Sequence, residues 1–217
     1  MTRVIAGQAG GRRLAVPPGT TTRPTSDRAR EGLFASLLSE LGSFDGARVL
    51  DLYAGSGAIG LEALSRGAER VLLIESDPRA AAVIKANIAA VALPGATVAT
   101  GKVERLLAHP PDKNGNDNNN NKDNKRNTNS YDLVIADPPY ALTEAAVTTV
   151  LTLLQAGWLN DGALVVVERA TRSGPLDWPP GFLPAKSRRY GEATFWYGWY
   201  GGEAEAGQTG TASRSEA

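Results

Sequence analysis

The 217-residue sequence predicts an α/β fold with a mostly parallel, seven-stranded sheet. From residue 47 onward, short apolar runs of strand length alternate with longer segments that have helical periodicity. A glycine-rich turn follows the first of these runs, and an aromatic run at 193–200 comes directly after another strand-like segment at 186–190. This ending predicts a terminal hairpin that contributes one antiparallel strand.

The first 22 residues predict a small basic β-hairpin that extends the main domain of residues 23–200. Short apolar fragments around Val4 and Leu14 are separated by glycines and arginines, although a poorly ordered arm is an alternative. A helix follows, because Leu33, Leu37 and Leu41 recur at four-residue spacing. Its cap is expected among Thr25, Ser26 and Asp27, whose side chains can accept from free N–H groups of a first turn.

The alternating region gives each remaining element in order. Asp77–Pro78 is typical of a helix start, with Asp as the cap and Pro at the first helical position. The expected strands are 47–51, 71–75, 97–100, 132–137 and 163–168, and the expected helices are 58–66, one beginning at 78, 104–108 and 143–156. Such alternation predicts a sheet covered on both faces, with ligands at the carboxyl ends of its strands.

Two segments are expected to be disordered. Residues 112–130 are rich in asparagine, lysine and aspartate without periodicity, and residues 201–217 are small and polar. The first is an insertion in a surface connection and not a domain boundary. No apolar run reaches membrane-spanning length and the start lacks the apolar core of a signal peptide, so we expect a cytoplasmic protein.

Composition narrows the chemistry. The chain has no cysteine, which excludes disulfides, thiolate metal sites and a cysteine nucleophile, and we expect no metal. Lys plus Arg equal Asp plus Glu at 23 each, but the charge is uneven along the chain. Residues 1–31 hold six arginines against Asp27 and Glu31, so this end can bind phosphates.

The glycine turn Gly55-x-Gly57-x-x-Gly60 follows a predicted strand and opens a helix. Glu75 ends the next strand, where a carboxylate can accept from both hydroxyls of a ribose. This arrangement suits a dinucleotide and S-adenosylmethionine alike, and a tight turn without a ligand is the structural alternative. The turn alone therefore does not choose the cofactor.

The segment Asp137-Pro138-Pro139-Tyr140 favours S-adenosylmethionine and methyl transfer to an exocyclic amino nitrogen. The nitrogen of an aromatic amine must become tetrahedral as it attacks, and acceptors aimed at its two hydrogens favour that change. The Asp137 carboxylate and the Pro138 carbonyl can be those acceptors, held in direction by rigid prolines, and Tyr140 offers a face for stacking. A turn that merely ends a strand is the alternative.

On these motifs the chain resembles the RsmD family, the guanine-N2 methyltransferases of 16S ribosomal RNA. The resemblance is carried by Arg23–Glu31 leading into Leu33-Phe34, by Leu50–Arg66, and by Asp137–Tyr140. It implies a Rossmann-like class I methyltransferase fold, S-adenosylmethionine as cofactor, and rRNA in an assembling small subunit as substrate. We expect a monomer that does not bind membranes.

The resemblance also implies roles for particular residues. Catalysis is assigned to Asp137, Pro138, Pro139 and Tyr140. The cofactor is assigned to Thr25, Asp51, Tyr53, Ala54, Gly55, Ser56, Gly57, Glu75, Ser76 and Val103. Contacts with rRNA are assigned to Arg3, Arg12, Arg13, Arg23 and Arg28. The chain departs from the family at Gly101–Glu104, where related enzymes often have an acidic or amide residue near the adenine.

Three other functions compete with this interpretation. A DNA adenine-N6 or cytosine-N4 methyltransferase uses the same turn, but such enzymes usually carry a further recognition domain, for which this chain has no room. An NAD-dependent oxidoreductase is favoured only by the glycine spacing. A noncatalytic RNA-binding module would use the arginines alone and leave Asp137–Tyr140 unexplained.

Overall fold

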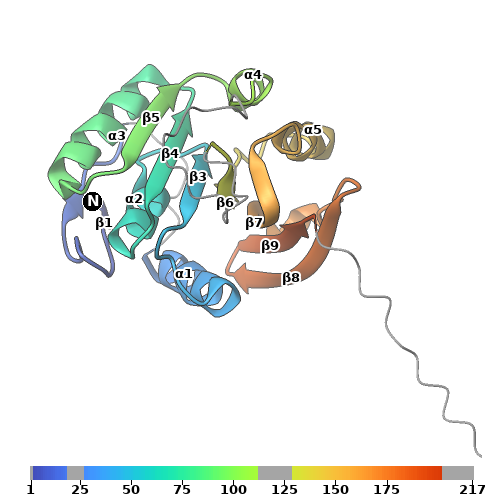
Figure 1. Cartoon of the computed structure of the whole chain (residues 1–217), viewed down its shortest axis with the longest axis horizontal. Helices are drawn as coiled ribbons and strands as arrows, with labels where there is room; N and C mark the ends of the chain where they lie inside the picture. Colours follow the sequence, from blue (N-terminus) through green and yellow to red (C-terminus); the bar gives the residue numbers. More distant parts are fainter. Residues whose placement is uncertain (1, 19–26, 112–128, 202–217) are drawn as a thin grey trace, which may run out of the picture.

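The computed structural model describes residues 2–18, 27–111 and 129–201 and is centred on one seven-stranded sheet (Figure 1). The strands lie in the order β5-β4-β3-β6-β7-β9-β8. Their bounds are β3 Arg48–Leu52, β4 Arg70–Glu75, β5 Ala96–Thr100, β6 Tyr131–Ala136, β7 Leu159–Ala170, β8 Phe182–Tyr190 and β9 Ala193–Tyr200. Strands β3 to β7 are parallel to one another, which confirms the mostly parallel sheet.

The terminal hairpin is present and supplies the antiparallel strand. β9 pairs antiparallel with β7 on one side and with β8 on the other. β7 is longer than expected because it begins with Leu159, which pairs with Tyr131 at the start of β6. A short 3-10 helix, η1 Thr171–Ser173, follows it.

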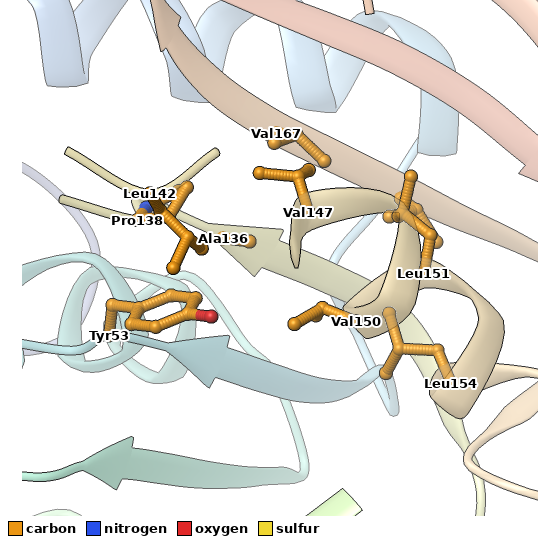
Figure 2. Close-up of a pocket in the computed structure, with 10 residues that line it drawn as sticks. Tyr53, Ala136, Pro138, Leu142, Val147, Val150, Leu151, Leu154 and Val167 are labelled. Atoms are coloured by element: carbon orange, nitrogen blue, oxygen red, sulfur yellow. The ribbon is translucent and has the colours of Figure 1, made fainter. Parts of the chain in front are cut away.

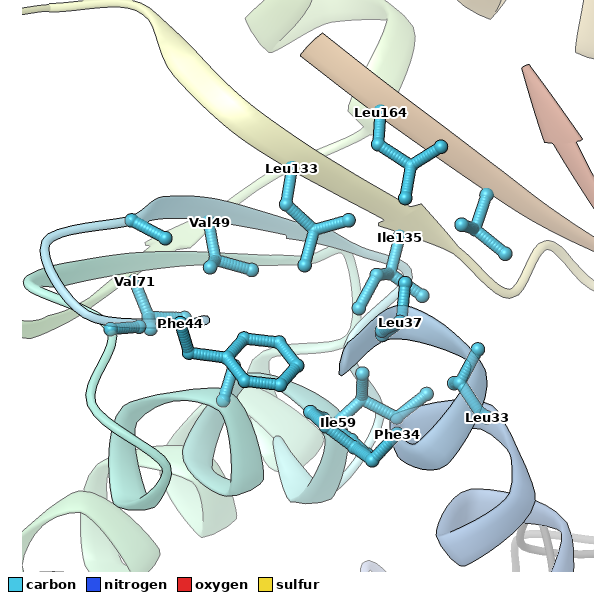
Figure 3. Packing of buried hydrophobic residues seen from close by; sticks show 14 of the residues in the cluster. Leu33, Phe34, Leu37, Phe44, Val49, Ile59, Val71, Leu133, Ile135 and Leu164 are labelled. Atoms are coloured by element: carbon cyan, nitrogen blue, oxygen red, sulfur yellow. The ribbon is translucent and has the colours of Figure 1, made fainter. Parts of the chain in front are cut away.

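Helices cover both faces of the sheet. On one face lie α1 Asp27–Leu41, α2 Ala58–Ser65 and α3 Pro78–Val91, and on the other lie α4 Val103–Leu107 and α5 Glu144–Leu154. Figure 3 shows the first face, where Leu33, Phe34 and Leu37 of α1 pack against strand residues such as Leu133 and Ile135. Alternate residues of each strand serve the two faces, as the period of a strand requires.

The helix starts follow local chemistry. Asp77 caps α3, since its Oδ1 accepts from the Arg79 N–H at 2.9 Å, and Pro78 is the first helical residue. Both features match the prediction for this helix. α1 begins at Asp27, while Thr25 and Ser26, the other expected caps, lie outside the described residues.

The basic hairpin at the start of the chain consists of β1 Thr2–Arg3 and β2 Arg13–Leu14, paired antiparallel. Its Val4, Ala9 and Leu14 are buried against α2 and α3, and Figure 1 shows the hairpin beside these helices. The Glu62 carboxylate on α2 accepts from the N–H groups of Ile5 at 2.6 Å and Ala6 at 3.0 Å. The hairpin is thus fixed to the helices by buried polar bonds as well as by apolar contact.

The predicted disorder of residues 112–130 and 201–217 falls almost wholly outside the described residues. Ser130 falls in the segment expected to be disordered, but it is buried and its hydroxyl donates to the Gly157 carbonyl at 2.9 Å. Within the described ranges, none of the helices combines the length and apolar character needed to cross a membrane.

Candidate active site

A cavity of about 530 Å³ opens at the carboxyl ends of β3, β4, β6 and β7. This volume lies within the range of about 300–1,000 Å³ that is usual for small-molecule sites. Four groups of residues line it: the glycine turn, the ends of the strands, the turn after β6, and a wall from the hairpin and α1. They are Thr2, Val16, Pro17, Arg30, Asp51, Tyr53, Ala54, Gly55, Ser56, Ala58, Ile59, Glu75, Ser76, Asp77, Ala80, Asp137, Pro138, Pro139, Tyr140 and Glu168.

The glycine turn is held against the end of β4 by Glu75. One carboxylate oxygen accepts from the Gly55 N–H at 2.8 Å, and the other accepts from the Asp77 N–H at 2.8 Å. Tyr53 and Gly55 have φ angles of 60° and 56°, so the chain enters the turn in the left-handed region, which is unusual for Tyr. The turn therefore has a fixed shape at the edge of the cavity.

Asp51, near the end of β3, accepts a hydrogen bond from the first turn of α2. Its Oδ2 accepts from the Gly60 N–H at 2.8 Å, and its side chain is almost wholly buried. The pKa of Asp51 is raised to about 7, chiefly by burial; the Gly60 bond opposes this rise, and the nearby carboxylates of Asp137 and Glu75 add to it. A free N–H at this helix start is thus already satisfied by the protein.

The turn Asp137–Tyr140 leaves the end of β6 beside β3. The Asp137 N–H donates to the Leu52 carbonyl at 3.3 Å, and the Pro139 carbonyl accepts from the Leu142 N–H at 2.8 Å. Below it, Figure 2 shows a small apolar space between Pro138, Tyr53 and the α5 residues Val147 and Val150. This space holds only about 10 Å³, so Pro138 rests on a packed layer that fixes the direction of the turn.

Tyr140 stands over the mouth of the cavity with 49% of its surface exposed. Its hydroxyl donates to Glu168 Oε1 at 3.4 Å. Glu168 lies near the carboxyl end of β7 and is only 4% exposed. Burial raises the pKa of Tyr140, and the carboxylates of Glu168 and Asp137 raise it further. The phenol therefore remains protonated and can present its ring face to a ligand.

Arg30 of α1 forms the opposite wall, with a side chain only 2% exposed. Its guanidinium donates to the Thr2 hydroxyl at 3.0 Å, to Asp27 Oδ1 at 3.1 Å and to the Arg3 carbonyl. Desolvation lowers the pKa of Arg30, although Asp27 and Glu62 oppose this. One buried side chain thereby joins the hairpin, the start of α1 and the cavity.

Comparisons with known proteins show the family to which the chain belongs. The family model described as "Conserved hypothetical protein 95" matches residues 2–199. "Ribosomal RNA small subunit methyltransferase D" of Escherichia coli K12 is 36% identical over 182 residues, 81% of this chain and 80% of the relative. The Haemophilus influenzae protein of the same name is 31% identical, over 89% of this chain and 91% of the relative.

A solved structure is similar as well. That of yhhF from E. coli superimposes with a TM-score of 0.73 at 32% identity and covers 92% of this chain and 97% of its own. The chain belongs to the RsmD family. The family resemblance stated from the sequence and the class I methyltransferase fold are thereby confirmed.

The structure places most of the residues assigned from the sequence around one cavity. All four residues of the Asp137–Tyr140 turn line the cavity. So do Asp51, Tyr53, Ala54, Gly55, Ser56 and Glu75 with Ser76. Gly57 and Val103 do not line it, and Val103 is buried in the core under α4 beside Leu107. Thr25 lies outside the described residues.

The region of the family departure, Gly101–Glu104, contacts the site through Tyr53. The Tyr53 hydroxyl donates to Glu104 Oε1 at 3.2 Å, and burial followed by the Glu104 charge raises the pKa of Tyr53. Glu104 therefore positions a residue of the cavity wall.

The arginines assigned to RNA differ in their surroundings. Arg3, Arg13 and Arg28 are exposed, whereas Arg23 lies outside the described residues. Arg12 is exposed too, but its guanidinium donates to the Ala90 carbonyl at 3.2 Å and to the Val91 carbonyl at the end of α3. Arg12 thus has a structural role that the sequence did not suggest, and the RNA contacts remain predictions.

Glu168 and Arg30 are charged cavity residues to which the sequence analysis assigned no role in the site, and Asp77 was expected only as a helix cap. Glu168 carried a signal, because it ends the predicted strand 163–168 at the ligand-binding edge. The sequence showed Arg30 only as one of the N-terminal arginines. It gave no sign of the bonds to Thr2 and Arg3, because these partners lie far away in the sequence.

Proposed function

We propose that this protein transfers a methyl group from S-adenosylmethionine to the exocyclic N2 amino group of a guanine in 16S rRNA during ribosome biogenesis. The observation that carries the proposal is the Asp137–Tyr140 turn, fixed at the end of β6 and facing the same cavity as the glycine turn. Membership of the RsmD family supports it, because relatives are named as small-subunit rRNA methyltransferases.

The lining of the cavity suits S-adenosylmethionine better than a dinucleotide. Five acidic residues and a single arginine line the described part of the cavity. Such a wall favours the positive sulfonium and ammonium groups of S-adenosylmethionine and disfavours a pyrophosphate. The Asp51 carboxylate also occupies the Gly60 N–H at the start of α2, where dinucleotide-binding folds hold the pyrophosphate. We infer that the turn at Gly55 and Ser56, with Glu75, holds the cofactor.

When bound, S-adenosylmethionine supplies an activated methyl carbon, whose bond to sulfur breaks as its bond to nitrogen forms. The Asp137 carboxylate and the Pro138 carbonyl accept the two hydrogens of the target amine and hold its lone pair in direction. Positive charge develops on that nitrogen beside Asp137, which stabilises it until the nitrogen releases one of its hydrogens to solvent as a proton. Tyr140, half exposed over the cavity, provides a stacking surface for a base swung out of the RNA.

The substrate contacts outside the cavity are assigned to the hairpin. Arg3 and Arg13 are directly opposite one another in β1 and β2, and both are exposed. Two like charges so close are unfavourable by themselves, and a phosphate between them would offset the repulsion. A small subunit under assembly in the cytoplasm is the substrate we expect for the monomeric protein.

The test is transfer of labelled methyl from S-adenosylmethionine to small ribosomal subunits that lack the modification, followed by digestion to nucleosides. We expect label in N2-methylguanosine. Label that enters DNA instead would favour the adenine-N6 or cytosine-N4 alternative. Absence of transfer to either, with the cofactor bound, would contradict the proposed acceptor but not the class of reaction.

A further inference from the structure

Glu168 lies beside the proposed catalytic turn because of the register of the sheet. Ala136 of β6 pairs with Val167 of β7 in a parallel ladder, so Asp137, directly after β6, lies at the same level as Glu168, near the carboxyl end of β7. Both line the cavity, and Glu168 is 4% exposed. The strand ends therefore present two carboxylates side by side to whatever base stacks under Tyr140.

The sheet and Tyr140 hold Glu168 in place. Its position in β7 is fixed by pairing with Phe195 of β9, and its Oε1 accepts from the Tyr140 hydroxyl at 3.4 Å. A carboxylate has two oxygens and roughly four acceptor positions, so it can accept from more than one donor at a time. The side chain can thus bind Tyr140 and a donor on a base together.

The bases differ in the group next to their amino nitrogen. In guanine, the ring nitrogen N1 next to the amino group carries a hydrogen, so this edge of the base presents two adjacent donors. In adenine and cytosine the amino group is followed by a ring nitrogen that carries a lone pair. A second carboxylate beside Asp137 would accept from guanine N1–H, whereas it would face a lone pair in the other two bases and leave both groups unsatisfied.

We propose that Glu168 is a specificity-determining residue that selects guanine by accepting from its N1–H while Asp137 holds the N2 amine. This rests on the proposed function, and it explains why the same kind of turn would here reject adenine and cytosine. Tyr140, bonded to Glu168, ties the stacking surface to the group that reads the base edge.

The experiment compares guanine with 2-aminopurine at the modified position of the rRNA, in reconstituted small subunits. 2-Aminopurine keeps the amino nitrogen but has a lone pair at N1 in place of N1–H. We expect the parent to methylate guanine more efficiently by about 10²-fold or more, because a site built to bond an N–H rejects an analogue that lacks it. The fluorescence of 2-aminopurine reports separately whether the base enters the cavity.

Two variants isolate the role of Glu168. Glu168→Gln keeps an oxygen for the Tyr140 hydroxyl and adds an amide donor for the N1 lone pair, so we expect the preference for guanine to narrow by at least about tenfold. Tyr140→Phe keeps the stacking ring and removes only the bond to Glu168, so it should narrow the preference for guanine less than Glu168→Gln does. The loss of guanine O6 in the analogue affects parent and variant alike and cancels in the comparison.

Equal rates of the parent on the two bases would overturn the proposal, and so would equal losses on both bases in Glu168→Gln. If Glu168→Gln does not fold, equal rates of the parent would still overturn the proposal, and the narrowing expected in Tyr140→Phe then tests the role of Glu168. Failure of the proposed function is distinguishable, because the parent would then form no N2-methylguanosine on the unsubstituted subunits.

Discussion

The two walls of the cavity are built in different ways. The strand-end wall, formed by Asp51, Glu75, Asp137 and Glu168, is acidic and is positioned by the backbone ladder of the parallel sheet. The hairpin wall, formed by Thr2, Val16, Pro17 and Arg30, is positioned by side chains that reach between distant segments.

Because of this difference, we expect the strand-end wall to determine catalysis and the hairpin wall to determine stability. The ladder keeps the backbone at Asp137 and Glu168 in position when these side chains are exchanged, whereas Asp51 and Glu75 also bond the start of α2 and the glycine turn. The hairpin has only two residues in each strand and depends on bonds to Glu62, Ser65 and Asn87. Substitutions in the first wall should change catalysis, and substitutions behind the second should change stability first.

Glu62→Ala should give the largest effect, on the free energy of unfolding. The Glu62 side chain is fully buried and accepts from Ile5 and Ala6, and its Oε1 also pairs with Arg66 Nε at 2.7 Å. Breaking a buried pair of this kind costs about 3–5 kcal/mol. Urea unfolding should show this loss, whereas the control Glu69→Ala, half exposed with a 3.7 Å contact to Arg48, should cost less than about 1 kcal/mol. Similar losses in both variants would remove the distinction between the walls.

Asp137→Ala tests the other wall. We expect kcat/KM for methyl transfer to fall by about 10²- to 10³-fold, because an acceptor aimed at the transition state is removed. The affinity for S-adenosylmethionine, measured by calorimetry, and the thermal unfolding should change little. Asp137→Asn keeps an acceptor oxygen but not the charge and should lie between. Unchanged turnover in Asp137→Ala would contradict the mechanism.

The dependence of stability on pH should reveal Asp51. Burial raises its pKa from 3.8 to about 7, so between these values the folded protein binds a proton that the unfolded chain has released. This contribution to stability is complete below 3.8 and is lost as pH rises to about 7, with a slope of at most about 1.4 kcal/mol per pH unit. The neutral Asp51→Asn should flatten the decline in urea titrations between pH 5 and 8. Parallel pH profiles would argue against a titrating Asp51.

The smallest effect concerns the hairpin arginines. Replacing Arg3 and Arg13 together with Gln should reduce the salt slope of rRNA binding by about 2, because two phosphate contacts are lost. The single variant Arg12→Gln removes one positive charge from the same hairpin and also a donor to the α3 carbonyls. It should lower stability by about 1 kcal/mol. An unchanged salt slope in the double variant would contradict the assignment to rRNA.

The sequence predicted the strand-end wall because its signals are local. Each buried strand is an apolar run, and Asp51, Glu75 and Asp137 follow such runs directly. Glu168 ended a predicted strand as well, but a single glutamate without a neighbouring motif does not indicate a role. Val103 was assigned by resemblance, yet α4 turns it into the core beneath the sheet.

The hairpin wall was less predictable because its bonds join residues that are far apart in sequence. Arg12 reaches carbonyls 78 and 79 positions away, and Asn87 accepts from the Ala15 N–H, 72 positions away. Arginine in a basic segment suggests a ligand for phosphate. Only the packed arrangement shows that Arg12 and Arg30 also donate to the protein itself.

Gly7 shows how closely the hairpin is seated. It has a φ of 81°, and a Cβ built there would lie 1.9 Å from the Ser65 carbonyl oxygen, so backbone rests on backbone with no room for a side chain. This contact between Gly7 and Ser65 seats the hairpin directly on the backbone of α2. If phosphates bind at Arg3 and Arg13, the distance from these arginines to Asp137 determines which base reaches the cavity. Only an RNA whose shape places a base at that distance would then be modified.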